Sequence, residues 1–165
     1  MTKRLLAVAL PLALAACGGS DSPTVFTIST GTYAVSGATS VQATDTCGLL
    51  PVYQASGKVI GINVSGTTAT FDLANNNPPA NTLPTATISG NTLGAGTEAN
   101  YTVAVGTTCV VRIHKSVTGD ITSNDHTALL LTFSAATDSG TCNPADLGFA
   151  NLPCNSSYHF LANKQ

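Results

Sequence analysis

Cysteine is the residue type in this 165-residue chain that is most able to do chemistry, because its thiol can be alkylated, oxidised or bound to a metal. The five cysteines are Cys17, Cys47, Cys109, Cys142 and Cys154. No Cys-x-x-Cys pair occurs, and the histidine spacings match no zinc pattern. We therefore predict no metal site, and lipid attachment and disulfide bonding remain as the uses of these thiols.

The residues before Cys17 follow the order of an export signal. Lys3 and Arg4 are followed by an apolar run over 5–16, which is too short to cross a hydrocarbon core of ~30 Å as a helix. The quartet Leu14-Ala15-Ala16-Cys17 then resembles the lipobox of bacterial lipoproteins. The alternative is an ordinary signal peptide with an incidental cysteine.

This resemblance implies a lipid anchor and a location in the bacterial cell envelope. The Cys17 thiol would carry a diacylglyceryl group. Cleavage before Cys17 would expose its α-amino group, which could carry a further fatty acyl chain. Gly18, where an Asp would favour the inner membrane of a Gram-negative cell, favours the outer membrane. The expected organisation is a helical signal peptide over 1–16, a lipidated, flexible tether over 17–24 and a β domain over 25–165.

No catalytic constellation is apparent, so we predict a non-enzymatic protein that needs no cofactor. The motifs of serine hydrolases, zinc proteases and nucleotide-binding loops are absent from the sequence. His114 and His159 fall at outward positions of predicted strands, and His126 follows a turn. Turn geometry also explains the carboxylates, which do not follow a calcium-loop spacing; they are Asp45, Asp120, Asp125 and Asp138.

One long loop is the best candidate for a contact surface. Residues 74–84, "ANNNPPANTLP", cannot form a strand interior, because prolines lack an amide donor and restrict the backbone. Long loops on rigid scaffolds commonly carry recognition. The candidate contact residues are Asn75, Asn76, Asn77, Pro78, Pro79 and Asn81. The alternative is a surface loop without a function.

Composition favours a β protein and excludes some partners. Only 8% of residues are charged, far below the ~25% of an average domain, and the formal net charge is −2. No basic stripe is present, so nucleic acid is not an expected partner. The abundance of Thr, Val, Ser and Gly favours strands and turns over helices, and no helix is expected after the signal.

Alternating apolar residues predict about eight strands in meander order. The clearest hairpin covers 59–73 with a turn at Ser65-Gly66, and a larger hairpin turns at Asn124-Asp125. The first strand, 32–43, places Tyr33, Val35 and Gly37 on one face. The remaining strands are expected at 85–89, 99–105 and 158–162, and residues after 89 are expected to turn. A closed or nearly closed barrel, architecturally similar to calycins and to lysozyme-inhibitor lipoproteins, is preferred to a β-sandwich.

The last hairpin indicates how the other four cysteines pair. If Ser123 and His126 flank the turn, Cys109 lies opposite residue 140, within one bulge of Cys142. Cys109–Cys142 would leave Cys47–Cys154, which ties the first strand to the last, as ring closure requires. The alternative is Cys142–Cys154 with Cys47–Cys109.

These observations support three hypotheses about function. The first is a lipid-anchored β domain that binds a partner protein, or a small apolar ligand in the barrel mouth. The second is a structural spacer of the envelope surface, and the third is a hydrolase of unfamiliar type. The sparse charge, the lipobox and the lack of catalytic motifs favour the first.

Overall fold

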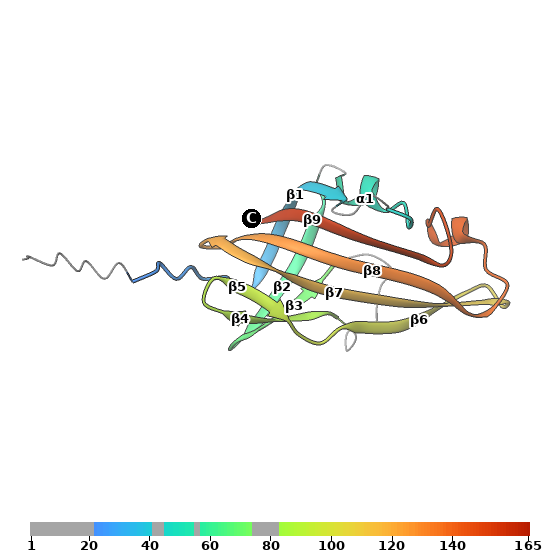
Figure 1. Ribbon diagram of the computed structural model, residues 1–165, viewed down its shortest axis with the longest axis horizontal. Helices are drawn as coiled ribbons and strands as arrows, with labels where there is room; N and C mark the ends of the chain where they lie inside the picture. The colour runs from blue at the N-terminus through green and yellow to red at the C-terminus, as the bar shows by residue number, and fades with distance from the viewer. Residues whose placement is uncertain (1–21, 41–44, 55–56, 74–82) are drawn as a thin grey trace, which may run out of the picture.

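The computed structural model describes residues 22–40, 45–54, 57–73 and 83–165 (Figure 1). The regular secondary structure of this part of the chain is β-strand, apart from two short helical turns. The strands are β1 (Gly31–Ser40), β2 (Val59–Ser65), β3 (Thr68–Asp72), β4 (Thr85–Ser89), β5 (Thr92–Ala95), β6 (Ala99–Val105), β7 (Cys109–Ser123), β8 (His126–Gly140) and β9 (Cys154–Lys164). The helical turns are α1 (Leu50–Gln54) and the 3-10 turn η2 (Pro144–Leu147).

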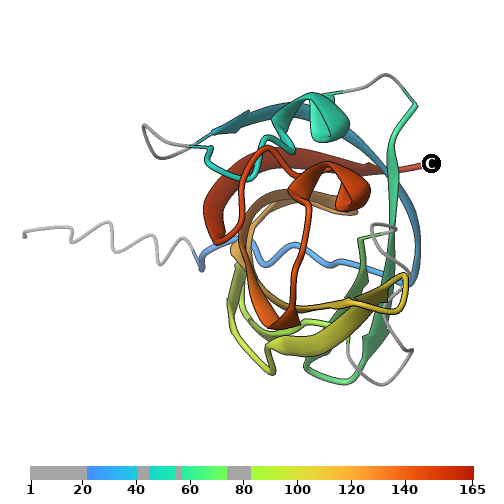
Figure 2. The ribbon, with the colours of Figure 1, turned by 90° about the vertical axis from the view of Figure 1, so that its right-hand side faces the viewer.

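The strands form one antiparallel sheet whose hydrogen bonding is ring-like. Their order is β5-β4-β3-β2-β1-β9-β8-β7-β6, and an additional pairing joins β5 to β7. Figure 2 views this ring from one end. The all-β antiparallel meander is confirmed, and the first and last strands are neighbours as predicted, with Tyr33 opposite Lys164.

β5 and β6 share one edge of the long strand β7. Thr92 and Leu93 of β5 pair with Asp120 and Gly119 in the second half of β7. β6 pairs with the first half of the same strand, from Cys109 to Lys115. Nine strands therefore occupy eight positions around the ring, close to the eight that the sequence predicts.

Strand alternation places one apolar core inside the ring. The prediction is confirmed for the hairpin of β2 and β3, where Ile60, Ile62 and Phe71 are buried. It is also confirmed for β9, whose Tyr158 and Phe160 point inward. The largest fully buried apolar side chains come from strands all around the ring and are Tyr33, Tyr158, Phe71, Phe133, Phe160, Ile62, Leu93, Ile113, Leu129, Leu131 and Val111.

The predicted inward face of β1 is wrong beyond Val35. The register between β1 and β9 shifts between Ser36 and Thr39, and Gly37 adopts a φ of 67°. An extra residue at a bulge reverses the alternation, so Gly37 is exposed and Ala38 is buried in its place. The predicted continuation over 41–43 lies outside the described residues.

Three further local predictions need correction. Thr92–Ala95 was expected to turn but forms β5, because Leu93, only 1% exposed, packs into the core. The turn between β2 and β3 is one residue later than predicted, at Gly66 and Thr67. The short turns α1 and η2 were not expected, and Asn143 caps η2 by accepting a hydrogen bond from the Ala145 amide.

The predicted register of the last hairpin and its disulfides are confirmed. Ser123 pairs with His126, and Cys109 lies opposite Gly140. The disulfides are Cys109–Cys142 and Cys47–Cys154. The second bond joins the segment after β1 to the first residue of β9, so it fastens the position where the two ends of the meander meet.

Candidate functional site

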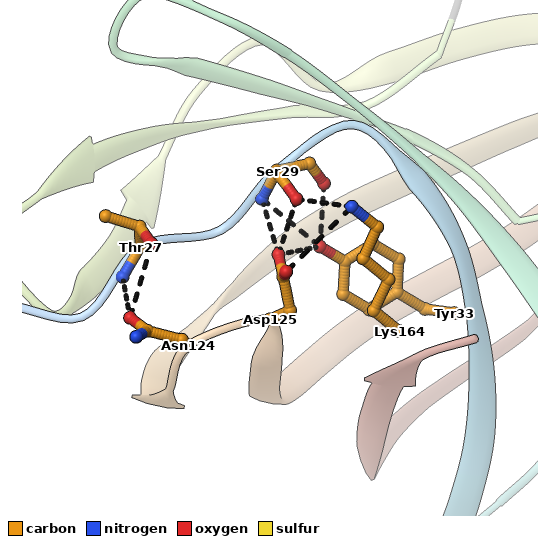
Figure 3. Close-up of polar contacts among 6 residues, drawn as sticks. All are labelled: Thr27, Ser29, Tyr33, Asn124, Asp125 and Lys164. Atoms are coloured by element: carbon orange, nitrogen blue, oxygen red, sulfur yellow. Dashed lines mark hydrogen bonds and ion pairs between the residues drawn. The ribbon is translucent and has the colours of Figure 1, made fainter.

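A polar cluster holds the N-terminal segment against the tip of the β7–β8 hairpin. Figure 3 shows this anchor cluster, which comprises Thr27, Ser29, Tyr33, Asn124, Asp125 and Lys164. The Ser29 amide and hydroxyl donate to Asp125 Oδ1 at 2.9 Å and 2.6 Å. The Thr27 amide donates to Asn124 Oδ1 at 2.9 Å. Residues 27–29 are therefore attached to a turn almost one hundred positions away in the sequence.

Asp125 can accept these hydrogen bonds at the turn because its backbone occupies the left-handed region, with a φ of 58°. Asn and Asp tolerate this conformation better than other residues that carry a side chain. The hydrogen bonds from Ser29 lower the pKa of Asp125, and Lys164, with Nζ 3.9 Å from Oδ2, adds to the effect. Burial raises the pKa of Tyr33 to about 12. The hydrogen bond that the Tyr33 hydroxyl donates to the Ser29 carbonyl opposes part of this shift.

Replacing Asp125 by Asn should loosen the N-terminal segment while the turn stays intact. Asn tolerates the same φ, so the loss reports on the charged hydrogen bonds. We expect about 1–2 kcal/mol less free energy of unfolding at pH 7. Because the folded pKa of Asp125 is lowered, this difference should shrink as pH falls through the carboxyl range.

Denaturant unfolding and amide hydrogen exchange measure this effect. Exchange at residues 27–29 should quicken in Asp125→Asn. The matched control is Asp120→Asn, an exposed carboxylate on the same hairpin, which should leave both readouts unchanged. Equal protection of residues 27–29 in Asp125→Asn and the unmodified chain would contradict the assignment.

A similar cluster lies beside the Cys47–Cys154 disulfide. Asp45 accepts hydrogen bonds from the Ser156 and Tyr158 hydroxyls, both at 2.6 Å. It also accepts bonds from the Gly48 and Leu50 amides. Burial alone would raise the pKa of Asp45, but these hydrogen bonds outweigh it and lower that pKa. Burial of Tyr158 and its hydrogen bond with the Asp45 carboxylate raise the pKa of Tyr158.

Lys115 is an internal charge that the sequence analysis did not single out. It is 1% exposed, and its ammonium lies 5.6 Å from the Tyr101 ring centroid and 5.7 Å from that of Phe133. Burial lowers the pKa of Lys115 to about 8, although Asp72 opposes the shift. Strict alternation from Val111 would have placed this residue inward, so the signal was present.

A surface hollow lies on the outer side of β2 and β3. We call this hollow of about 430 Å³ the outer groove, and its lining residues are Thr30, Gly31, Gly61, Ile62, Asn63, Thr70, Asp72 and Leu83. Gly31 and Gly61 contribute no side chain. Ile62 is buried in the core, Leu83 offers apolar surface, and Asn63 and Asp72 are exposed polar groups. The groove therefore combines apolar contact with hydrogen-bonding groups, as recognition surfaces do.

The other candidate residues fall into two groups, those outside the described residues and those on the strands. Cys17 and the contact residues Asn75, Asn76, Asn77, Pro78, Pro79 and Asn81 lie outside the described residues. His114 faces outward beside Asn100 and Glu98, His126 contacts Asn163, and His159 is exposed. Asp138 does not lie in a turn as predicted. It belongs to β8 and pairs with Arg112, because the hairpin strands extend to residue 140.

Two further features concern ligands and the membrane. Within the described ranges, no three His, Cys, Asp or Glu side chains gather in a way that could hold a metal ion. Among the same residues, no helix has the length and apolar character needed to span a bilayer.

The fold and the two clusters define a disulfide-bonded, all-β protein with a ring-like antiparallel sheet. No protein-family model, curated protein or solved structure matches the chain.

Proposed function

We propose that this chain is a lipid-anchored protein of the bacterial cell envelope whose β domain binds a partner protein without catalysis. The lipobox-like quartet ending at Cys17 supports the anchor. Gly18 supports placement in the outer membrane. The outer groove is the observation that carries the binding proposal, because Leu83, which belongs to the predicted contact loop 74–84, lines it.

A protein partner is favoured over a small ligand inside the ring. Tyr33, Phe71, Phe133, Tyr158 and Phe160 are each fully buried and fill the interior from several strands. In contrast, the outer groove opens to the surface and presents both backbone and polar side chains. A protein surface can use such a groove without displacing the packed core.

Blocking the outer groove should strongly reduce partner binding. Thr70 lies half-buried on the outer side of β3 and lines the groove, so Thr70→Arg fills it with a long charged side chain. Thr102→Arg on the exposed side of β6 is the matched control. We expect crosslinking in intact cells to capture a defined protein with the unmodified chain and Thr102→Arg, and about tenfold less with Thr70→Arg.

Other results of this experiment would contradict the proposal. Equal capture by all three chains would place the contact elsewhere. Capture of no protein would favour the structural spacer. A small apolar molecule that copurifies in native mass spectrometry would favour ligand binding instead.

The anchor has its own test. The mature chain should begin at residue 17 and carry fatty acyl mass there, whereas Cys17→Ala should move the protein from the membrane to the soluble fraction. Each buried methylene contributes about 0.8 kcal/mol, so two or more chains make release negligible. Intact-mass measurement and cell fractionation give the result. A membrane-bound Cys17→Ala protein, or a mature chain without acyl mass, would contradict lipid anchoring.

A further inference from the structure

The end of the ring where the N-terminal segment attaches carries an apolar surface as well as the Asp125–Lys164 ion pair of the anchor cluster. A groove of about 330 Å³ lies between this segment and the turns of β2–β3 and β4–β5. Its apolar lining comes from Val25, Phe26, Ile28, Val64 and Ile88, and none of its lining residues is acidic or basic. Val25 is 62% exposed, the largest exposure among the large apolar side chains in the described ranges.

Hydrogen bonds hold this segment in place on the groove. Asn91, in the β4–β5 turn, accepts from the Phe26 amide at 2.7 Å and donates to the Thr24 carbonyl at 2.7 Å. The anchor cluster holds the next residues at the β7–β8 turn. Val25 is therefore exposed on a segment that is held in place, so its side chain is available for contact with another surface.

The short distance in sequence to Cys17 points to a lipid bilayer as that other surface. Val25 lies eight positions after Cys17, and a fully extended chain spans at most about 3.5 Å per residue, or about 28 Å in total. A bilayer that holds acyl chains on Cys17 is therefore always within this distance of the groove. Such tethering gives the apolar end a high effective concentration at the lipid surface.

We propose that this end of the ring faces the bilayer and that the groove around Val25 lies against the lipid surface. The inference rests on the proposed lipid anchor and adds an orientation to it. In Figure 1 the N-terminal segment leaves at the left, beside the β7–β8 turn. The 3-10 turn η2 and the β6–β7 turn lie toward the right, so they point away from the membrane.

Lipid-based quenching tests this orientation. A non-natural ketone residue, which leaves the disulfides undisturbed, replaces Thr67 in the β2–β3 turn or Thr107 in the β6–β7 turn, both exposed. Each full, acylated protein carries a fluorophore there and is placed in phosphatidylethanolamine–phosphatidylglycerol vesicles with nitroxide-labelled lipids. We expect at least about threefold more quenching at position 67 than at position 107. Equal quenching, or stronger quenching at position 107, overturns the proposal.

Two valine variants separate lipid contact from mere tethering. Val25→Asp should reduce the quenching at position 67 to the level seen at position 107. Val59→Asp, at another exposed valine that does not line the groove, should leave it unchanged. An unchanged signal in Val25→Asp overturns the contact.

Intact-mass measurement of the same samples separates this inference from the proposed function. An acylated protein with little quenching at position 67 overturns the orientation and leaves the anchor standing. A chain without acyl mass at residue 17 overturns the anchor before any quenching is measured.

Discussion

Replacing Cys47 and Cys154 together by alanine should lower the free energy of unfolding by about 4 kcal/mol. The two residues are separated by 107 positions, so the bond restricts a long loop of the unfolded chain. It also lies where β9 meets the segment after β1, beside the Asp45 cluster. Alanine is used because a buried serine hydroxyl would add a desolvation cost of its own.

The other disulfide, Cys109–Cys142, provides the matched control. Cys109 and Cys142 are separated by 33 positions, so removing this bond should cost roughly 1 kcal/mol less by the same loop-entropy argument. Denaturant unfolding of both double variants at one pH gives the comparison. If the Cys109–Cys142 variant were the less stable of the two, loop closure would not be the main contribution of these bonds.

The second large effect should come from Lys115 and depend on pH. The folded pKa of Lys115 is lowered to about 8 from the 10.5 of an exposed lysine. Between these values the unfolded chain binds more protons than the folded chain, so stability rises with pH. We expect the free energy of unfolding to increase by about 2 kcal/mol between roughly pH 7 and pH 9.5.

Above about pH 10 the tyrosines should reverse this trend. Burial raises the folded pKa of Tyr33 to about 12, so the unfolded chain loses this proton first and stability falls as pH rises further. Tyr158, whose pKa is also raised, acts in the same direction. The stability maximum should therefore lie on the alkaline side of neutrality, between the ranges in which Lys115 and the tyrosines titrate.

Lys115→Met should remove the rise below pH 9.5. Methionine has a similar shape and no charge, so the variant should also be more stable than the unmodified chain at pH 7, by roughly 1–2 kcal/mol. Lys58→Met, at an exposed lysine, is the matched control and should keep the rise. A Lys115→Met protein with the same pH dependence as the unmodified chain would contradict the assignment.

Local patterns predicted most of the strands and both disulfides. Period-two alternation identifies an inward face, because successive side chains of a strand point to opposite sides. The Asn124-Asp125 turn sets the hairpin register, and that register places Cys109 near Cys142. The pairing of Cys47 with Cys154 then follows from the two cysteines that remain.

Two errors arose where local signals and tertiary packing disagree. The glycine-rich stretch around Leu93 suggests a turn, but pairing with β4 and β7 and burial of Leu93 make it a strand. In β1, Gly37 permits a bulge, and pairing with the neighbouring strand β9 is what stabilises it. In each case the deciding partner lies far away in the sequence.

The candidate sites divide in the same way. The sequence by itself determined the lipobox resemblance, the β character and the register of the long hairpin, because these depend on residue type and on spacing over a few turns or strands. The tertiary structure alone decided that Ser29 meets Asp125 and that the outer groove opens beside Leu83. Those arrangements join residues that come from separate segments of the chain, and their sequence separation leaves no local pattern.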